Sequence, residues 1–192
     1  DQGYAQRPFA LAGDSAGGSL SLVTMMRARD ALLPMPDCAA LLSPSTDLTM
    51  SAPSAKYNAK ADPMFSPAAE DLLPEVYCPG QDRQNPLLSP LFGNWNGLPP
   101  LLFHAGSTEM LLDDSIRAHD RAVQAGVAAD FFRRAQLGAP VAAHASAARG
   151  GCDEGRRGRD HARRGAAHDA GLGRASGGVS GCRGRTFVAE LR

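Results

Sequence analysis

The fold is decided by the stretch Phe9-Ala10-Leu11-Ala12-Gly13-Asp14-Ser15-Ala16-Gly17-Gly18. Its first four residues form an apolar run, which predicts a buried strand over residues 9–12 that ends at Gly13. Residues 18–32 follow with apolar side chains at helical spacing, and Pro34 closes that segment. The side chains at this spacing are Leu22, Met25, Met26 and Leu32. The stretch therefore predicts a strand that turns directly into a helix.

Two further apolar runs, residues 38–42 and residues 101–105, predict buried strands downstream. Residues 49–97 are rich in Pro, Ser, Asn and Asp, which predicts long loops with one short helix that begins near Ser66-Pro67. A last helix is predicted over residues 113–125. Its apolar face would carry Ile116, His119 and Val123. Buried strands that alternate with helices predict an α/β fold, with a parallel sheet, flanking helices and right-handed crossovers.

The motif between the first strand and its helix contains Gly13-x-Ser15-x-Gly17, with Asp14 and Ala16 between. A strand that turns at once into a helix forces the central serine into strained backbone angles. Side chains two positions away on either side would collide, which favours glycine at both. The hydroxyl of Ser15 then projects clear of the sheet, and the N–H of Ala16 lies where a helix begins and favours an oxyanion. This pattern predicts a nucleophilic serine.

A serine nucleophile needs a base, and the base needs a carboxylate that orients it. In this type of site the chain order is serine, acid, histidine. Residues 106–115 follow the third predicted strand and offer Glu109, Asp113 and Asp114. Asp113 and Asp114 have a second interpretation, because carboxylates also stabilise the first turn of a helix.

With these motifs, the sequence resembles the bacterial hormone-sensitive-lipase-like carboxylesterases of the α/β-hydrolase superfamily. The resemblance implies ester hydrolysis without a cofactor, through an acyl-serine intermediate, with a small-molecule ester as substrate. It implies Ser15 as nucleophile, Ala16 as an oxyanion donor and, in register with Ala125-Gly126, Glu109 as the acid; Asp113 and Asp114 remain alternatives. The motifs that carry it, through about residue 131, are residues 11–18, Leu42-Ser43-Pro44-Ser45-Thr46-Asp47-Leu48-Thr49, Ala61-Asp62-Pro63-Met64, residues 85–92, Gly97-Leu98-Pro99-Pro100 and residues 106–115.

The general base is the part of this pattern that the sequence does not supply. The family places it about thirty residues after the acid, near position 139, where the chain has Ala139-Pro140. His104 and His119 fall in a predicted strand and on a helix face, which favours packed core residues. His144 is the nearest in chain order, but Ala flanks it on both sides; His161 and His168 lie further on. The family's upstream His-Gly-Gly-Gly oxyanion loop precedes the first residue given. We therefore expect little or no esterase activity from this chain.

Charge and composition divide the chain after Arg133. Residues 1–133 carry 9 basic and 15 acidic side chains, whereas residues 134–192 carry 11 Arg, no Lys and 5 acids. In that second segment Ala, Gly and Arg make 36 of 59 residues, which predicts a disordered tail. A one-nucleotide reading-frame slip near Arg133 would explain both this composition and the missing base. Shifted by one base, Ala139-Pro140 can encode His.

Several function classes are disfavoured by the sequence. The four cysteines have neither a disulfide-scaffold pattern nor a zinc-like spacing, so we expect no metal. No apolar run reaches the length of a membrane span. Zero net charge predicts no nucleic-acid partner, although the basic tail leaves nonspecific phosphate binding as a minor alternative. With no targeting signal visible, we expect a cytoplasmic location. The alternative to an esterase is a non-catalytic hydrolase-fold remnant or interaction protein.

Overall fold

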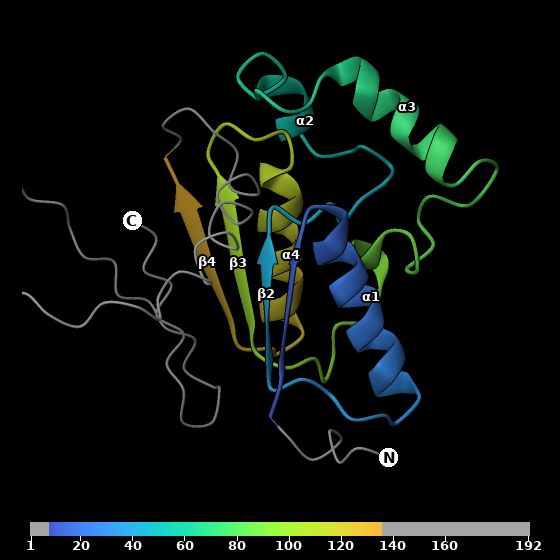
Figure 1. Cartoon of the computed structure of the whole chain (residues 1–192), viewed down its shortest axis with the longest axis vertical. Coiled ribbons are helices and arrows are strands. Elements are labelled where there is room, and N and C mark those ends of the chain that lie inside the picture. Colours follow the sequence, from blue (N-terminus) through green and yellow to red (C-terminus); the bar gives the residue numbers. More distant parts are fainter. Residues whose placement is uncertain (1–7, 136–192) are drawn as a thin grey trace, which may run out of the picture.

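The computed structural model describes residues 8–135, and these residues form a parallel sheet with helices (Figure 1). The strand order is β1-β2-β3-β4, and every neighbouring pair is parallel. The predicted α/β class and parallel sheet are therefore confirmed. The strands are β1 (Ala10–Asp14), β2 (Cys38–Leu42), β3 (Leu101–Gly106) and β4 (Ala129–Arg134).

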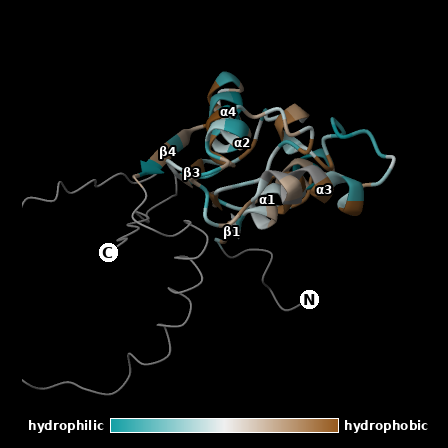
Figure 2. Cartoon of the chain, turned by 90° about the horizontal axis from the view of Figure 1, so that it is seen from above, coloured by the Kyte–Doolittle hydropathy of each residue, from teal (hydrophilic) through white to brown (hydrophobic). Residues whose placement is uncertain are grey.

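Two helices, α1 (Ala16–Asp30) and α4 (Leu112–Gln124), cover the same face of the sheet (Figures 1 and 2). Between β2 and β3 lie α2 (Ser54–Tyr57), α3 (Pro67–Tyr77) and the short 3-10 helix η2 (Pro90–Phe92). In Figure 1, α3 lies apart from the sheet, at the upper right. Among the described residues, no helix is both long enough and apolar enough to cross a membrane.

The core lies between the sheet and these two helices. Strand β3 contributes two alternate residues to this core, Leu101 and Phe103, and both are fully buried. Their spacing is the two-residue period of a strand. From α1 come Leu22 and Met25, at the helical spacing that the sequence predicts. Because all four strands are parallel, their carboxyl ends lie at one edge of the sheet.

The first strand and helix are shifted from their predicted bounds. The strand runs to Asp14 instead of ending at Gly13, and the helix covers Ala16–Asp30 instead of residues 18–32. Leu32 lies beyond the helix and is 94% exposed, so its predicted place on the apolar face is wrong. The turn between the two elements is thus a single residue, Ser15.

The last helix and strand also differ from the sequence prediction. The buried side of α4 carries Leu112, Ser115, Ala118 and Ala122, whereas Val123 is 52% exposed. The predicted apolar face is therefore only partly right: His119 does pack against the core residue Phe103, but Val123 does not. Small residues, which allow a close approach to the sheet, fill most of the buried side. The strand β4 was not predicted, since its two Phe residues are flanked by charged ones and are half-buried. The predicted tail, 134–192, lies almost entirely outside the described residues.

Candidate active site

Ser15 forms the whole connection between β1 and α1. Its backbone has φ 52° and ψ −120°, a region that residues with a side chain rarely adopt. Its N–H donates to the carbonyl of Leu42 at 2.9 Å, and its own carbonyl accepts from the N–H of Gly18 at 3.0 Å. These bonds continue the sheet on one side and start the helix on the other. The strain predicted at this serine is therefore present.

The glycines around Ser15 have different roles. A Cβ at Gly13 would lie 2.2 Å from the carbonyl oxygen of Gly17, which is backbone and cannot move aside. A Cβ at Gly17 would meet its nearest neighbour, Asp14 Oδ1, at an ordinary 3.7 Å, so the collision predicted for Gly17 is wrong. A Cβ at Gly18 would lie 2.6 Å from the Cβ of Pro44. Gly13 and Gly18 thus allow the helix to approach both β1 and the loop after β2.

Ala16 is the first residue of α1, and its side chain is exposed. Its N–H is among the first four of the helix, which lack a partner within the helix. The dipole of α1 adds partial positive charge at the same place. The arrangement can therefore stabilise an oxyanion beside Ser15.

Glu109 follows β3 in the loop before α4 and is 4% exposed. The hydroxyl of Ser43 donates to Glu109 Oε2 at 2.5 Å, and the side-chain amide of Asn58 donates to the carbonyl of Glu109 at 2.8 Å. A Cβ at Gly106 would lie 2.8 Å from Glu109 Oε1, so the acid folds back over its own strand end. The carboxylate is thereby held in one position.

Ser15 and Glu109 line the same pocket. The pocket opens at the carboxyl edge of the sheet, where parallel α/β folds bind ligands. Its lining combines two hydroxyls, two carboxyls and three apolar side chains. The lining residues are Ser15, Ser43, Asp62, Met64, Phe65, Glu109 and Leu111.

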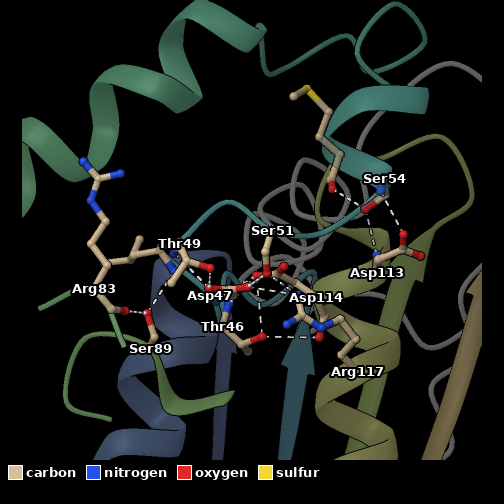
Figure 3. Close-up of polar contacts among 12 residues, drawn as sticks. Thr46, Asp47, Thr49, Ser51, Ser54, Arg83, Ser89, Asp113, Asp114 and Arg117 are labelled. Carbon is tan, nitrogen blue, oxygen red and sulfur yellow. Dashed lines mark hydrogen bonds and ion pairs between the residues drawn. The ribbon is translucent and has the colours of Figure 1, made fainter. Parts of the chain in front are cut away.

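Asp113 lies outside this pocket and holds α2 (Figure 3). Its Oδ2 accepts from the N–H of Ser54 at 2.8 Å, and its Oδ1 accepts from the hydroxyl of Tyr57 at 2.9 Å. In return, the N–H of Asp113 donates to the hydroxyl of Ser54. Burial, and then the bond to Asp113, raise the pKa of Tyr57. Both oxygens of this carboxylate are engaged in joining α2 to α4.

Asp114 also lies outside the pocket and is 3% exposed. Its Oδ2 accepts from the N–H of Thr46 at 2.6 Å and from the N–H of Asp47 at 3.0 Å (Figure 3). Burial, reinforced by the charge of Asp47 and only partly offset by these bonds and by Arg117, raises the pKa of Asp114 to about 7. This carboxyl therefore anchors the loop after β2.

Asp47 is buried next to it but behaves in the opposite way. Burial acts to raise its pKa, yet bonds from Ser51, Thr49 and Arg117 together outweigh burial and lower the pKa. The guanidinium of Arg117 lies 2.9 Å from Asp47 Oδ2. The partners of Asp47 thus offset the cost of burying its charge, whereas the bonds of Asp114 offset that cost only in part.

The loop of residues 43–47, which we call the brace, connects these carboxyls to the pocket. Its far end is anchored on Asp114. Closer to the pocket, the N–H of Ser45 donates to the carbonyl of Ser15 at 3.2 Å, and Ser43 donates to Glu109. The brace therefore contacts both the backbone of the serine turn and the carboxylate.

The two described histidines are core residues, as predicted. His104 is 8% exposed, its Nδ1 has no hydrogen-bond partner among residues 8–135, and burial lowers its pKa. The ring of His119 packs between Phe103 and Phe131, with centroids 6.1 and 5.8 Å away. Neither histidine lines the pocket. Position 139, His144, His161 and His168 lie outside the described residues. Within those residues no group of acidic, His or Cys side chains could hold a metal ion.

Sequence reasoning missed the two other polar residues of the pocket, Ser43 and Asp62, as well as its three apolar side chains. Ser43 directly follows a buried strand, and its place at the shared sheet edge was the signal that could have identified it. Asp62 was interpreted as a turn or cap residue. It does accept from the N–H of Met64 at 2.8 Å, as a turn residue would, but it also accepts from the N–H of Met110 at 2.7 Å.

Comparisons with known proteins show which family this fold belongs to. The family model described as an alpha/beta hydrolase fold matches residues 1–138. An acetyl-hydrolase of Streptomyces hygroscopicus is 36% identical over 131 residues, which are 68% of this chain and 44% of the relative. An esterase of Acinetobacter venetianus is 37% identical over 135 residues, covering 68% of this chain and 43% of the relative. The chain thus spans less than half the length of these relatives.

Solved structures give the same result. A hormone-sensitive lipase from a metagenome library is 40% identical with a TM-score of 0.66, over 69% of this chain and 45% of that protein. The esterase EstE5, in crystals soaked with p-nitrophenyl butyrate, is 42% identical with a TM-score of 0.67, over 71% of this chain and 46% of that protein. The chain therefore belongs to the α/β-hydrolase family, in its hormone-sensitive-lipase-like branch of bacterial esterases.

Proposed function

We propose that this chain carries the serine and the acid of a carboxylic ester hydrolase. The single observation behind the proposal is the strained backbone of Ser15, a residue that lines the same pocket as Glu109. Strain of this kind persists only where the surrounding structure enforces it, and it concentrates at functional sites. Asp113 and Asp114 are the less favoured acids, because backbone and side-chain donors occupy their oxygens outside the pocket.

In the proposed reaction, Ser15 Oγ attacks the ester carbonyl while a histidine base accepts its proton. The N–H of Ala16 donates to the oxyanion of the tetrahedral intermediate. The intermediate collapses to an acyl-serine, and the base returns the proton to the departing alcohol. Water, activated by the same base, then releases the carboxylic acid. Glu109 orients the base and stabilises its positive charge; no cofactor takes part.

We further propose that the chain as written is impaired, because position 139 is Ala139 followed by Pro140. Loss of one member of a catalytic triad typically costs about four to six orders of magnitude in rate. His144 remains the alternative base. Impairment keeps a second function open, that of a non-catalytic member of the fold with an interaction role. The cytoplasmic location stays a prediction.

Hydrolysis of p-nitrophenyl butyrate tests these points. The full chain is compared with Ser15→Ala and with Ser21→Ala, a matched loss of a hydroxyl on α1 outside the pocket. We expect turnover near the rate of Ser15→Ala. Turnover well above the rate of Ser15→Ala would contradict impairment. If that turnover also persists in Ser21→Ala, it would support the serine mechanism. In that case His144→Ala tests whether His144 is the base.

The coding DNA separates impairment from absence of function. If a single-base correction near Arg133 restores a His near position 139, we expect the corrected chain to gain Ser15-dependent turnover. A corrected chain whose turnover is unaffected by Ser15→Ala would contradict the proposed function. If no single-base correction encodes such a His, the frame-slip hypothesis is rejected.

A further inference from the structure

Three apolar side chains are among those that line the pocket, and we call them its apolar wall: Met64, Phe65 and Leu111. Leu111 is buried, Phe65 is half-buried, and Met64 is 55% exposed. The wall thus runs from the core outward to the surface. An apolar group that enters the pocket would gain the free energy of burial against these side chains.

Asp62 connects this wall to the loop that carries Glu109. Its Oδ1 accepts from the N–H groups of Met64 at 2.8 Å and Phe65 at 3.2 Å. Its Oδ2 accepts from the N–H of Met110, the neighbour of Glu109, at 2.7 Å. One buried carboxyl therefore sets the position of Met64 and Phe65 relative to the acid loop.

The charges at the pocket point to the ligand class. Asp62 and Glu109 both line it, and within residues 8–135 no Lys, Arg or His does. A ligand that carries its own carboxylate or phosphate would be repelled, and the repulsion is strong because the site is partly withdrawn from water. An uncharged ester meets no such repulsion.

We propose that Asp62 is a positioning residue, which holds Met64 and Phe65 as the binding wall for the uncharged, apolar acyl group of an ester. This inference rests on the proposed function, since it assigns the acyl side of the same pocket. Its distinctive element is the bond from Met110 to Asp62, which a simple turn residue would not need.

Ligand binding by NMR tests the proposal without turnover. The full chain is labelled with 13C at its methionine methyl groups, and Met64→Leu identifies the Met64 signal. The probes are butyranilide, an amide that resists hydrolysis, and succinanilic acid, which replaces its terminal methyl with a carboxylate. We expect butyranilide to shift the Met64 signal, and succinanilic acid to bind about tenfold more weakly.

Variants of Asp62 distinguish its bond from Met110 from its turn bonds to Met64 and Phe65. Asp62→Asn keeps one acceptor oxygen for Met64 and Phe65, but places an NH₂ against the N–H of Met110. We therefore expect Asp62→Asn and Asp62→Ala both to weaken butyranilide binding about fivefold or more. Asp82→Asn is the matched control, since Asp82 makes the same kind of turn, to Gln84 N at 2.9 Å, on the exposed surface. It should bind like the parent.

The methyl signals of the core residues Met25 and Met26 report whether each variant folds. If the Asp62 variants fail to fold, Phe65→Ala replaces them, and it should weaken butyranilide binding similarly. Equal binding of the two probes, no shift at Met64, or a folded Asp62→Asn that binds like the parent would each overturn the inference. Because binding needs no reaction at Ser15, failure of the proposed function would appear separately, in the hydrolysis assay.

Discussion

The two ends of α1 carry residues with nearly the same unusual backbone angle, but for different reasons. Ser15, before the first turn, has φ 52°, and Leu32, after the last turn, has φ 53°. For a residue with a side chain this conformation costs about 1 to 3 kcal/mol. At Ser15 the surrounding structure enforces the strained angle, whereas at Leu32 the angle only accompanies the end of the helix.

At the amino end, strong constraints surround Ser15. Leu42, Gly18 and Ser45 all bond to its backbone, and Gly13 packs against the carbonyl of Gly17. At the carboxyl end, the N–H of Leu32 donates to Arg29 and that of Leu33 to Ala28, which is how helices commonly terminate. Leu32 itself is 94% exposed. Similar φ angles therefore mark a turn that its neighbours hold in place at one end and an ordinary helix stop at the other.

The largest expected effect comes from Gly13→Ala. The new methyl would lie 2.2 Å from a backbone oxygen, so β1 and α1 must separate. We expect a loss of more than about 4 kcal/mol in the free energy of unfolding, measured with urea. Gly17→Ala is the paired control, because its Cβ has room; it should be neutral or stabilise by up to about 1 kcal/mol. Equal losses at both positions would contradict the constraint at Ser15.

The next effect is a pH dependence of stability that arises from Asp114, the carboxyl that anchors the brace. Folding raises the pKa of Asp114 from 3.8 to about 7, so the folded state binds this proton more tightly than the unfolded state does. The stability from this group is present below about pH 4 and is lost as pH rises towards 7. At 1.36 kcal/mol per pKa unit the loss is about 4 kcal/mol.

Asp47 works in the opposite direction. Because folding lowers its pKa, this carboxyl contributes stability at pH values above its ordinary pKa, and that stability is lost as the pH falls through the lowered pKa. Urea unfolding of the parent and of Asp114→Asn, from pH 4.5 to 8, isolates the first carboxyl. We expect the variant to lose most of the decline in stability across this range. A variant with the same decline as the parent would show that ionisation of Asp114 is not what lowers the stability.

The smallest effects come from relieving the two angles with glycine. Leu32→Gly should stabilise by about 1 kcal/mol, since the angle suits glycine and little buried surface is lost. Ser15→Gly should also relieve strain, but it removes the proposed nucleophile. Thermal unfolding measures both. A destabilised Leu32→Gly would indicate that the carboxyl end is constrained as well.

Much of the fold could be predicted because it depends on local patterns. The run at residues 38–42 is the strand β2, and Pro67 does begin α3. Local patterns failed where pairing with another strand determines the structure. The segment β4 is a strand because β3 pairs with it, although its own residues are half-buried and partly charged. The extent of β1 through Gly13 likewise depends on pairing with β2.

The candidate site divides in the same way. Ser15, Ala16 and the acid loop could be located from spacing, because the turn and strand ends are local features. Ser43 and the bridging role of Asp62 could not, since their partners Glu109 and Met110 lie 66 and 48 residues further along the chain. Only the folded sheet edge brings them together. The base near position 139 stays a prediction.

We propose that Ser15 is a nucleophile because the fold holds it in this turn. Mass spectrometry after incubation with a p-nitrophenyl alkylphosphonate tests it directly, since that reagent phosphonylates an activated serine. We expect slow release of nitrophenol and an adduct on the peptide that contains Ser15, absent in Ser15→Ala and present in Ser21→Ala. An unmodified Ser15, or equal modification of Ser21, would contradict the claim.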